Sequence, residues 1–277
     1  MGDGILSGLE SFGLSGLEGM SLFEEEKKEE TKAKEAPVVK ESDFLLDKSM
    51  KCPLCECDFK MRAVKGGKAK LLGTDMDLRP KYQEIDITKY DVVSCPYCGY
   101  TALTRYFDGL LSSQAKKIKE TITSKFRSDM SYHETYSYDE AIERYKLALV
   151  NAVVKGAKAS EKAYICLKAS WVARGKAEKI GEGDPDYAKA RAMEAEFTKN
   201  AYEGFAAAVQ SESFPMCGMD EMTVDYLLGV LAYETDHLEV ASKMIATVLQ
   251  SVSASNRVKD KTRDLKELVV KKIKAKG

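Results

Sequence analysis

The sequence has little of what most enzyme active sites need. Histidine occurs only twice, at His133 and His237, and neither Cys166 nor Cys217 has a histidine near it in sequence. No segment contains a nucleophile elbow, a metalloprotease helix motif or a complete phosphate-binding loop. Because no nucleophile, base and orienting group can be assembled, the sequence predicts a protein without catalytic activity.

An excess of one charge and long apolar runs are also missing. The 43 basic and 44 acidic side chains give a formal net charge of -1, so nothing global attracts nucleic acid or an anionic membrane. No apolar run approaches the roughly 20 residues of a membrane span, and the N-terminus lacks a signal-peptide pattern. The seven cysteines are mostly spaced as metal ligands, which is typical of a reducing compartment. These features predict a cytoplasmic protein with no membrane partner.

Four cysteines form two Cys-x-x-Cys pairs, Cys52 with Cys55 and Cys95 with Cys98. Two tight turns in this spacing bring four thiolates to one tetrahedral ion, so the pairs predict one structural Zn²⁺. With all four positions filled by protein, no bound water is left to activate, which argues against zinc hydrolysis. A redox pair or an iron–sulfur cluster is the alternative. Cys57 follows two residues after Cys55 and could compete for the metal.

Composition divides the chain into three parts. Residues 1–45 are glycine-rich and acidic and repeat Leu-Ser-Gly-Leu-Glu, which predicts a disordered arm, with a short docking motif as the alternative. Residues 46–107 are the predicted zinc ribbon. Residues 108–277 have alanine, lysine, glutamate and leucine at helical spacing and few prolines, which predicts a helical domain.

Within the ribbon, alternating stretches on either side of Gly66-Gly67 predict a hairpin. A further strand near 90–94 is expected to lead into the second cysteine pair. The segment 75–82 contains turn residues, and we expect an ordered loop that packs on the metal core.

The helical part has an internal repeat. Helices are predicted near 108–130, 137–155, 160–180, 185–210, 219–234, 237–251 and 257–275. Small, large and small or branched residues recur at i, i+4 and i+7, most completely at Ala241, Ile245 and Val248. This pattern is typical of second helices in tetratricopeptide-type hairpins. The predicted fold class is mainly α, with a small N-terminal zinc ribbon followed by a degenerate tetratricopeptide-like helical array.

Several stretches together carry a family resemblance. They are Cys52-Pro53-Leu54-Cys55 with Phe59, Asp75-Met76-Asp77 with Pro80 and Tyr82, and the segments 90–102, 141–148 and 170–174. Over roughly residues 46–250 the chain resembles a bacterial family catalogued as domain of unknown function 2225. The resemblance implies a zinc-ribbon-like segment joined to tetratricopeptide-like helices. Because the family has no agreed activity, it implies no reaction, and its pattern asks for no ligand at Cys57.

Five cations follow the first cysteine pair with no acid between them: Lys60, Arg62, Lys65, Lys68 and Lys70. Lysine contacts to phosphate, combined with stacking on nearby aromatic rings, are how proteins bind nucleic acid without sequence preference. The alternative is a solvated hairpin whose aromatic side chains cover the zinc core.

A second basic stretch lies in the helices, where nine basic residues and four acids occur between residues 140 and 180. If Arg144, Lys168 and Arg174 line a concave face, they suit an acidic peptide or a C-terminal carboxylate. The alternative is an exposed charged face that keeps the helices soluble. The leading hypothesis is an interaction or scaffold protein that binds an unknown protein or peptide partner. A nucleic-acid-associated regulator that uses the basic hairpin is the second hypothesis.

Overall fold

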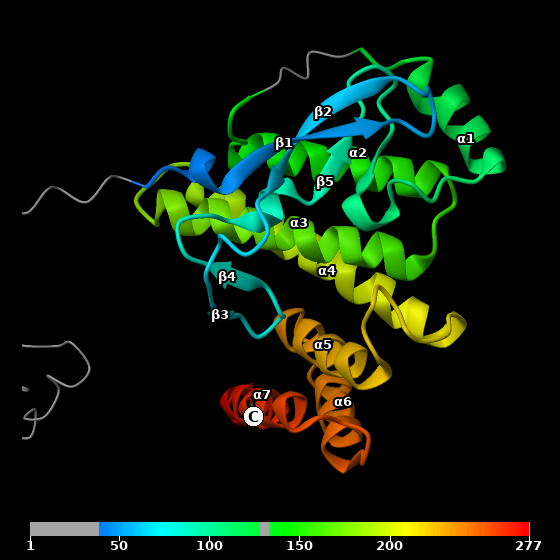
Figure 1. The fold of residues 1–277 in the computed structure, drawn as a ribbon. Helices are drawn as coiled ribbons and strands as arrows, with labels where there is room; N and C mark the ends of the chain where they lie inside the picture. The colour runs from blue at the N-terminus through cyan, green and yellow to red at the C-terminus, as the bar shows by residue number, and fades with distance from the viewer. Residues whose placement is uncertain (1–38, 128–132, 277) are drawn as a thin grey trace, which may run out of the picture. The chain divides into compact units, whose positions relative to one another are not determined.

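Helices dominate the computed structural model, which describes residues 39–127 and 133–276 (Figure 1). Three small two-stranded antiparallel sheets lie in the N-terminal part of this range, and two of them carry the cysteine pairs in their connecting turns. The predicted fold class, mainly α with a small N-terminal β segment, is confirmed. The Leu-Ser-Gly-Leu-Glu repeat and most of the predicted arm lie outside the described residues.

The strands pair in an order that differs from the prediction. β1 (Leu45–Lys51) pairs with β2 (Asp58–Val64), β3 (Leu71–Thr74) with β4 (Pro80–Tyr82), and β5 (Val92–Ser94) with β6 (Thr101–Leu103). The predicted hairpin around Gly66-Gly67 is therefore wrong. β2 pairs with the strand before the first cysteine pair, because the turn that holds those cysteines joins β1 directly to β2.

The segment between β3 and β4 also differs from the prediction. It packs against helices and not on the metal core. The Trp171 indole Nε1 donates to Asp77 Oδ2 at 2.8 Å, and the Tyr226 hydroxyl donates to the Met76 carbonyl at 2.7 Å. This turn therefore connects the N-terminal sheets to α3 and α5 of the helical array.

Seven α-helices lie in the described residues. They are α1 (Ser112–Ile118), α2 (Tyr138–Val154), α3 (Ala159–Ile180), α4 (Tyr187–Ser211), α5 (Glu221–Glu234), α6 (Leu238–Gln250) and α7 (Asn256–Lys276). The bounds of α2 to α7 agree with the prediction to within two residues at each end. The first predicted helix, 108–130, is shorter in the structure, because α1 passes into a π-helical turn that ends at Thr123.

Local sequence explains where these helices begin. Ser137 accepts a hydrogen bond from Glu140 N at 3.1 Å, and the Glu140 carboxylate accepts one from Ser137 N at 2.8 Å, which is a capping box at the start of α2. Asp220 caps α5 in the same way by accepting from Thr223 N at 2.8 Å. None of the helices in the described part of the chain has an apolar stretch long enough to cross a membrane.

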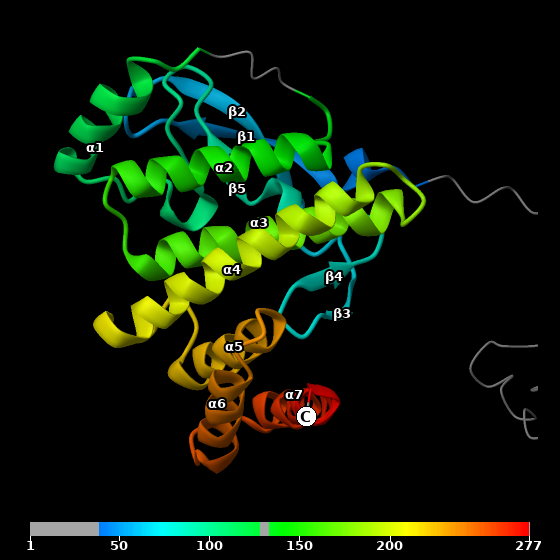
Figure 2. The same ribbon diagram turned by 180° about the vertical axis from the view of Figure 1, so that it is seen from behind.

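Each helix from α2 to α7 packs against the next one in sequence, and β5 and β6 pack on α2. Figure 2 shows this succession from behind, from α2 in green to α7 in red. The repeated small-large-small residues are all buried in α2, α4 and α6: Ala141, Tyr145, Ala148, Ala201, Phe205, Ala208, Ala241, Ile245 and Val248. The repeat noticed in the sequence therefore marks the faces on which these three helices pack.

Candidate metal centre and the charged groups around it

The two cysteine pairs occupy turns of the same construction. Residues 52–57 connect β1 to β2, and residues 95–100 connect β5 to β6. In each turn the first N–H donates to the sixth carbonyl and the fifth N–H donates to the first carbonyl. The four bonds are Cys52 N to Cys57 O at 3.0 Å, Glu56 N to Cys52 O at 2.9 Å, Cys95 N to Tyr100 O at 2.9 Å and Gly99 N to Cys95 O at 3.1 Å.

The fifth position of each turn has a left-handed backbone. Glu56 has φ 61° and Gly99 has φ 74°. Glycine adopts this conformation without strain, whereas a glutamate pays a small steric cost. At Gly99 space matters as well, since an added Cβ would lie 2.6 Å from the Phe126 ring. The second turn therefore has two independent reasons to contain glycine.

The two turns bring their cysteine sulfurs together. Cys52 Sγ lies 3.6 Å from Cys98 Sγ, and Cys55 Sγ lies 3.6 Å from Cys95 Sγ. All four sulfurs lie within 4.8 Å of one another. A tetrahedral ion with metal–sulfur bonds of about 2.3 Å places its ligands about 3.8 Å apart. The four cysteines that the spacing predicts can therefore hold a metal ion, as both their distances and their donor chemistry fit one.

Hydrogen bonding among these cysteines shifts the pKa values of three of their thiols in opposite directions. Bonds from Cys95 and Cys98 hold the pKa of Cys52 well below its ordinary value, and the same bonds raise the pKa of Cys95 and of Cys98. The Leu54 N–H also points at Cys52 Sγ, at 3.4 Å. A bound metal ion takes the place of the shared protons, because a cation stabilises every sulfur as a thiolate.

Cys57 lies outside the group of four. It is exposed, and its thiol is directed to the Cys55 carbonyl at 3.6 Å. In the second turn the equivalent sixth position is Tyr100, which is fully buried and donates its hydroxyl to the Phe107 carbonyl at 2.9 Å. Cys57 thus closes the first turn through its backbone, and its sulfur is not one of the four that converge.

The second turn is tied to the helices. Thr123 Oγ1, at the end of the π turn, donates to the Cys98 carbonyl at 2.9 Å. Asn151 Nδ2, in α2, donates to the Gly99 carbonyl at 3.1 Å. Both side chains therefore hydrogen-bond to peptide groups of the turn that forms the metal site. Loss of structure in this turn would remove contacts that hold the helices.

Residues 45–269 match the bacterial family described as "Uncharacterized protein conserved in bacteria (DUF2225)". The chain belongs to the DUF2225 family. The match begins at the first residue of β1 and ends inside α7, so both metal-binding turns lie in the DUF2225 region. No curated protein and no solved structure matches the chain. The family resemblance seen in the sequence is confirmed.

Two cations of the basic stretch in this DUF2225 chain are engaged inside the protein. The Arg62 guanidinium is largely buried, with Nη1 2.5 Å from Asp47 Oδ1 and Nε donating to the Glu134 carbonyl at 2.8 Å. Lys65 Nζ donates to the Asp43 carbonyl at 3.0 Å. These contacts give Arg62 a structural role in the β1–β2 pair.

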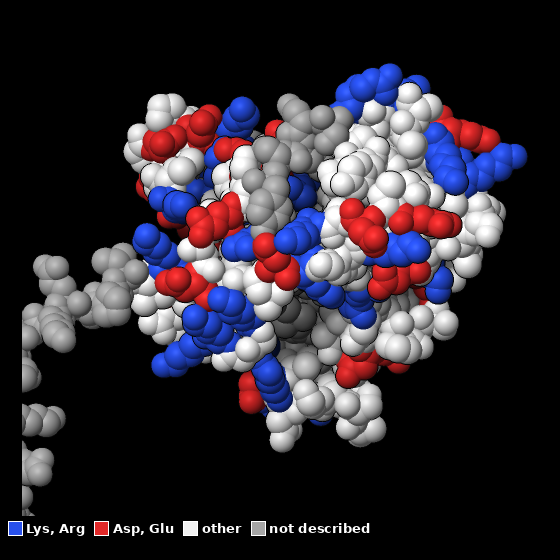
Figure 3. Space-filling model, turned by 45° about the horizontal axis from the view of Figure 1, so that its top comes forward, with Lys and Arg blue, Asp and Glu red and all other residues white. Residues whose placement is uncertain are grey.

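The rest of the basic stretch lies on the surface. Lys60, Lys68 and Lys70 are exposed, whereas Phe59 and Tyr100, two of the rings that flank the stretch in sequence, are buried. On the face that Figure 3 shows, basic and acidic side chains are interspersed and form no continuous basic surface. The basic surface that this stretch presents to solvent is therefore smaller than the sequence indicates.

The predicted peptide contacts are also partly used within the fold. Arg144 lies over the Tyr136 ring, 4.2 Å from its centre. Lys168 Nζ is 2.5 Å from Asp91 Oδ2. Arg174 is the most heavily engaged cation of the three and pairs with several carboxylates. Only part of the predicted cationic set is thus available to a partner.

Arg174 lies at the centre of an acidic cluster. Its Nη1 donates to Asp75 at 3.2 Å, its Nη2 to Asp77 at 2.8 Å and its Nε to Glu194 at 2.7 Å. Glu234 lies further away, with a carboxylate oxygen 3.8 Å from Nη2. The acidic neighbours raise the pKa of Arg174 and outweigh its desolvation, so the guanidinium stays charged. Four carboxylates therefore share one guanidinium.

The acidic members of this cluster were not predicted from the sequence. One signal was available in α4, where Glu194 is buried in the same stripe as Ala190, Phe197 and Ala201. An acid at helical spacing among apolar residues must find a cation inside the fold, because an unpaired buried charge is costly. The identity of that cation depends on how α3 packs on α4, which no local pattern contains.

Proposed function

We propose that this DUF2225 chain is a non-catalytic scaffold protein, in which one Zn²⁺ fixes the N-terminal hairpins and the helical array binds a protein or peptide partner. The observation that carries the metal part is the group of four cysteine sulfurs within 4.8 Å. Four thiolates in tetrahedral spacing suit zinc and fill its shell. A reducing cytoplasm keeps such thiols available for metal, so we place the protein there.

The succession of packed helices supports the scaffold part. Consecutive helices from α2 to α7 pack on one another, and α2, α4 and α6 bury the same small-large-small face. Arrays of this kind, of which tetratricopeptide repeats are one, use the faces that their packing leaves open as extended binding surfaces. Here a cavity opens between α4, the α5–α6 turn and α7, which offers a partner a concave contact.

The remaining reactive side chains support a role without catalysis. Burial raises the pKa of the Cys166 thiol to about 12, and burial likewise raises the pKa of the Cys217 thiol. Both are therefore thiols at neutral pH, whereas nucleophilic cysteines are thiolates. His237 stacks on the Tyr202 ring with the ring centres 4.5 Å apart, far from either thiol in sequence.

Cross-linking of the full-length chain to its partners in the cells that produce it tests the scaffold proposal. We expect one protein partner to be recovered repeatedly, with cross-linked lysines concentrated on α4 to α7 and the site mapped by mass spectrometry. Recovery of nucleic acid alone, or of protein cross-linked only to the strand pairs, would contradict the proposal.

Nucleic-acid binding is the second candidate, supported by the exposed lysines Lys60, Lys68 and Lys70 and by Tyr97, which is 63% exposed in the second cysteine turn. If it holds, changing the three lysines to alanine should lower affinity for a single-stranded oligonucleotide at least tenfold at low salt and flatten its salt dependence. Changing Lys116, Lys199 and Arg263, which are exposed elsewhere, is the matched control. Equal loss in both triple variants, or no binding by the unaltered chain in low salt, would exclude this function.

A further inference from the structure

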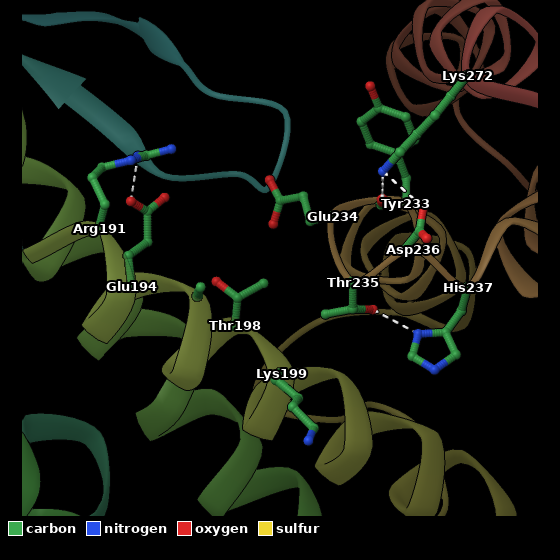
Figure 4. Close-up of a pocket in the computed structure, with 11 residues that line it drawn as sticks. Arg191, Glu194, Thr198, Lys199, Tyr233, Glu234, Thr235, Asp236, His237 and Lys272 are labelled. Atoms are coloured by element: carbon green, nitrogen blue, oxygen red, sulfur yellow. Dashed lines mark hydrogen bonds and ion pairs between the residues drawn. The ribbon is translucent and has the colours of Figure 1, made fainter. Parts of the chain in front are cut away.

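The cavity beside the acidic cluster has a volume of about 590 Å³, within the range of about 300–1,000 Å³ typical of ligand pockets. Its walls come from α4, the turn between α5 and α6, and α7 (Figure 4). Three cations and three carboxylates line it: Arg191, Lys199, Lys272, Glu194, Glu234 and Asp236. Because the two charges are equal in number, the charge of a ligand that the cavity can bind depends on which of these side chains are already paired with each other.

Each cation in the wall already has an acidic partner. Arg191 binds Glu194 on the same helix, and Lys199 lies 3.9 Å from Glu203. Lys272 Nζ is 3.2 Å from Asp236 Oδ1 and donates to the Tyr233 carbonyl at 3.1 Å. An anionic ligand would have to displace one of these acids before it gained a cation.

Glu234 differs from the other two carboxylates. Figure 4 shows its side chain between the Arg191–Glu194 pair and the α5–α6 turn, with no dashed line reaching its oxygens. Among the described residues its one ionic contact is Arg174 at 3.8 Å, and it accepts no hydrogen bond. Arg174 offers Glu234 no hydrogen bond, because its nitrogens donate to Asp75, Asp77 and Glu194.

The electrostatic surroundings of Glu234 agree with this geometry. Burial, together with the nearby carboxylates of Asp77 and Glu194, raises the pKa of Glu234 to about 7 against the opposing effect of Arg174 and Arg191. The other charged or titratable side chains that line the cavity are Lys199 of α4, Tyr233 of α5, Asp236 and His237 of the α5–α6 turn, and Lys272 of α7, which is paired with Asp236. The side chain is 26% exposed, so a ligand can reach it. A second cation beside Glu234 would complete its pairing.

We propose that this cavity binds a lysine or arginine side chain of the partner, with the Glu234 carboxylate as its acceptor. The inference rests on the proposed scaffold function and adds the chemistry of the partner. It differs from the acidic peptide expected from the sequence, which relied on Arg144, Lys168 and Arg174. The donors of Arg174 are used within the fold.

Binding of this kind is linked to pH. A cation pairs with the ionised carboxylate, and a group with a pKa of about 7 is ionised in about one tenth of molecules at pH 6 and about nine tenths at pH 8. The apparent affinity scales with the ionised fraction, so it should rise about tenfold from pH 6 to pH 8.

The test titrates the full-length chain with an acetylated, amidated tri-lysine peptide and, separately, with a tri-glutamate peptide, at pH 6 and pH 8. The variants are Glu234→Gln and Glu239→Gln. Glu239 lies on α6, is exposed and does not line the cavity, which makes it the matched control for the loss of one negative charge. Thermal unfolding of Glu234→Gln at pH 8 should be as cooperative as that of the unaltered chain and no lower in midpoint, because an incompletely paired carboxylate is removed.

We expect tri-lysine to bind about tenfold more tightly at pH 8, Glu234→Gln to weaken it at least tenfold at pH 8, and Glu239→Gln to leave it within twofold. Absence of tri-lysine binding, pH-independent binding, equal binding to both variants, or a preference for tri-glutamate would each overturn the assignment. Partner cross-linking separates this result from the scaffold proposal. A partner recovered equally by Glu234→Gln removes the cavity assignment alone, whereas no partner for the unaltered chain removes the scaffold.

Discussion

Cys95→Ser is expected to abolish metal binding and to unfold the N-terminal strand pairs. Structural zinc supplies on the order of 10 kcal/mol to the folding of small metal-held units. A typical domain has a total stability of only about 5–15 kcal/mol, so little stability would remain in a segment held by this ion. The measurement is metal content per chain by elemental analysis, together with the temperature of unfolding followed by circular dichroism.

The effect should reach the helices. Thr123 and Asn151 donate to the carbonyls of Cys98 and Gly99, so collapse of the second turn removes two hydrogen bonds that hold α2 and the end of the π turn. We expect increased amide hydrogen exchange in α1 and in the C-terminal half of α2, whereas α6 and α7, far along the array, should change little.

Cys57→Ser is the matched control, because it removes a thiol two residues from a ligand while leaving the group of four intact. We expect full metal content and an unfolding temperature within about 2 °C, since exposed side chains contribute little. If metal instead survives Cys52→Ser or Cys55→Ser and is lost from Cys57→Ser, the ligand set is wrong.

Arg174→Met is expected to cost about 3–5 kcal/mol in the free energy of unfolding, because it leaves the buried carboxylate of Asp77 without its cation. Methionine keeps much of the apolar stem, so the loss reports the charge rather than a void. Urea unfolding at pH 7 measures the change, with the midpoint compared at constant slope.

Two further variants identify the cause of that loss. Arg263→Met removes a cation whose Asp260 pair is mostly exposed, and it should cost less than about 1 kcal/mol. Asp77→Asn in the Arg174→Met background should recover part of the loss, since a neutral amide tolerates burial and the Trp171 indole can still donate to its oxygen. Equal costs for Arg174→Met and Arg263→Met would show that the cluster has no structural role.

The helices and the four cysteines were predictable because their signals are local. Helical periodicity and caps such as Asp220 depend on residues within a few positions of each other. A Cys-x-x-Cys pair likewise dictates a tight turn, and two such pairs suffice to predict convergence. The structure reproduces both features, down to the burial of the repeated faces of α2, α4 and α6.

Strand pairing was not predictable in the same way. Gly66-Gly67 has the composition of a hairpin turn, but β2 had another candidate partner in β1, on the far side of the first cysteine turn. Both choices satisfy local propensity, and the metal-binding turn decides between them. The Gly66-Gly67 segment instead links one sheet to the next.

The charged groups show the largest gap between sequence and structure. Arg62, Lys168 and Arg174 are indistinguishable from solvated cations in sequence, yet each has an acidic partner in the fold. Asp77 and Arg174 are 97 positions apart, and the sequence does not specify that they meet. The incompletely paired Glu234 follows from the same non-local packing, which is why the cavity emerged only from the structure.

Zinc-edge X-ray absorption of the protein purified from its own cells is the decisive measurement for the metal site. We expect about one zinc ion per chain, with four sulfur ligands at about 2.3 Å and no nitrogen or oxygen ligand. A first shell containing nitrogen or oxygen, an iron–sulfur signal, or a folded chain that contains no metal would contradict it.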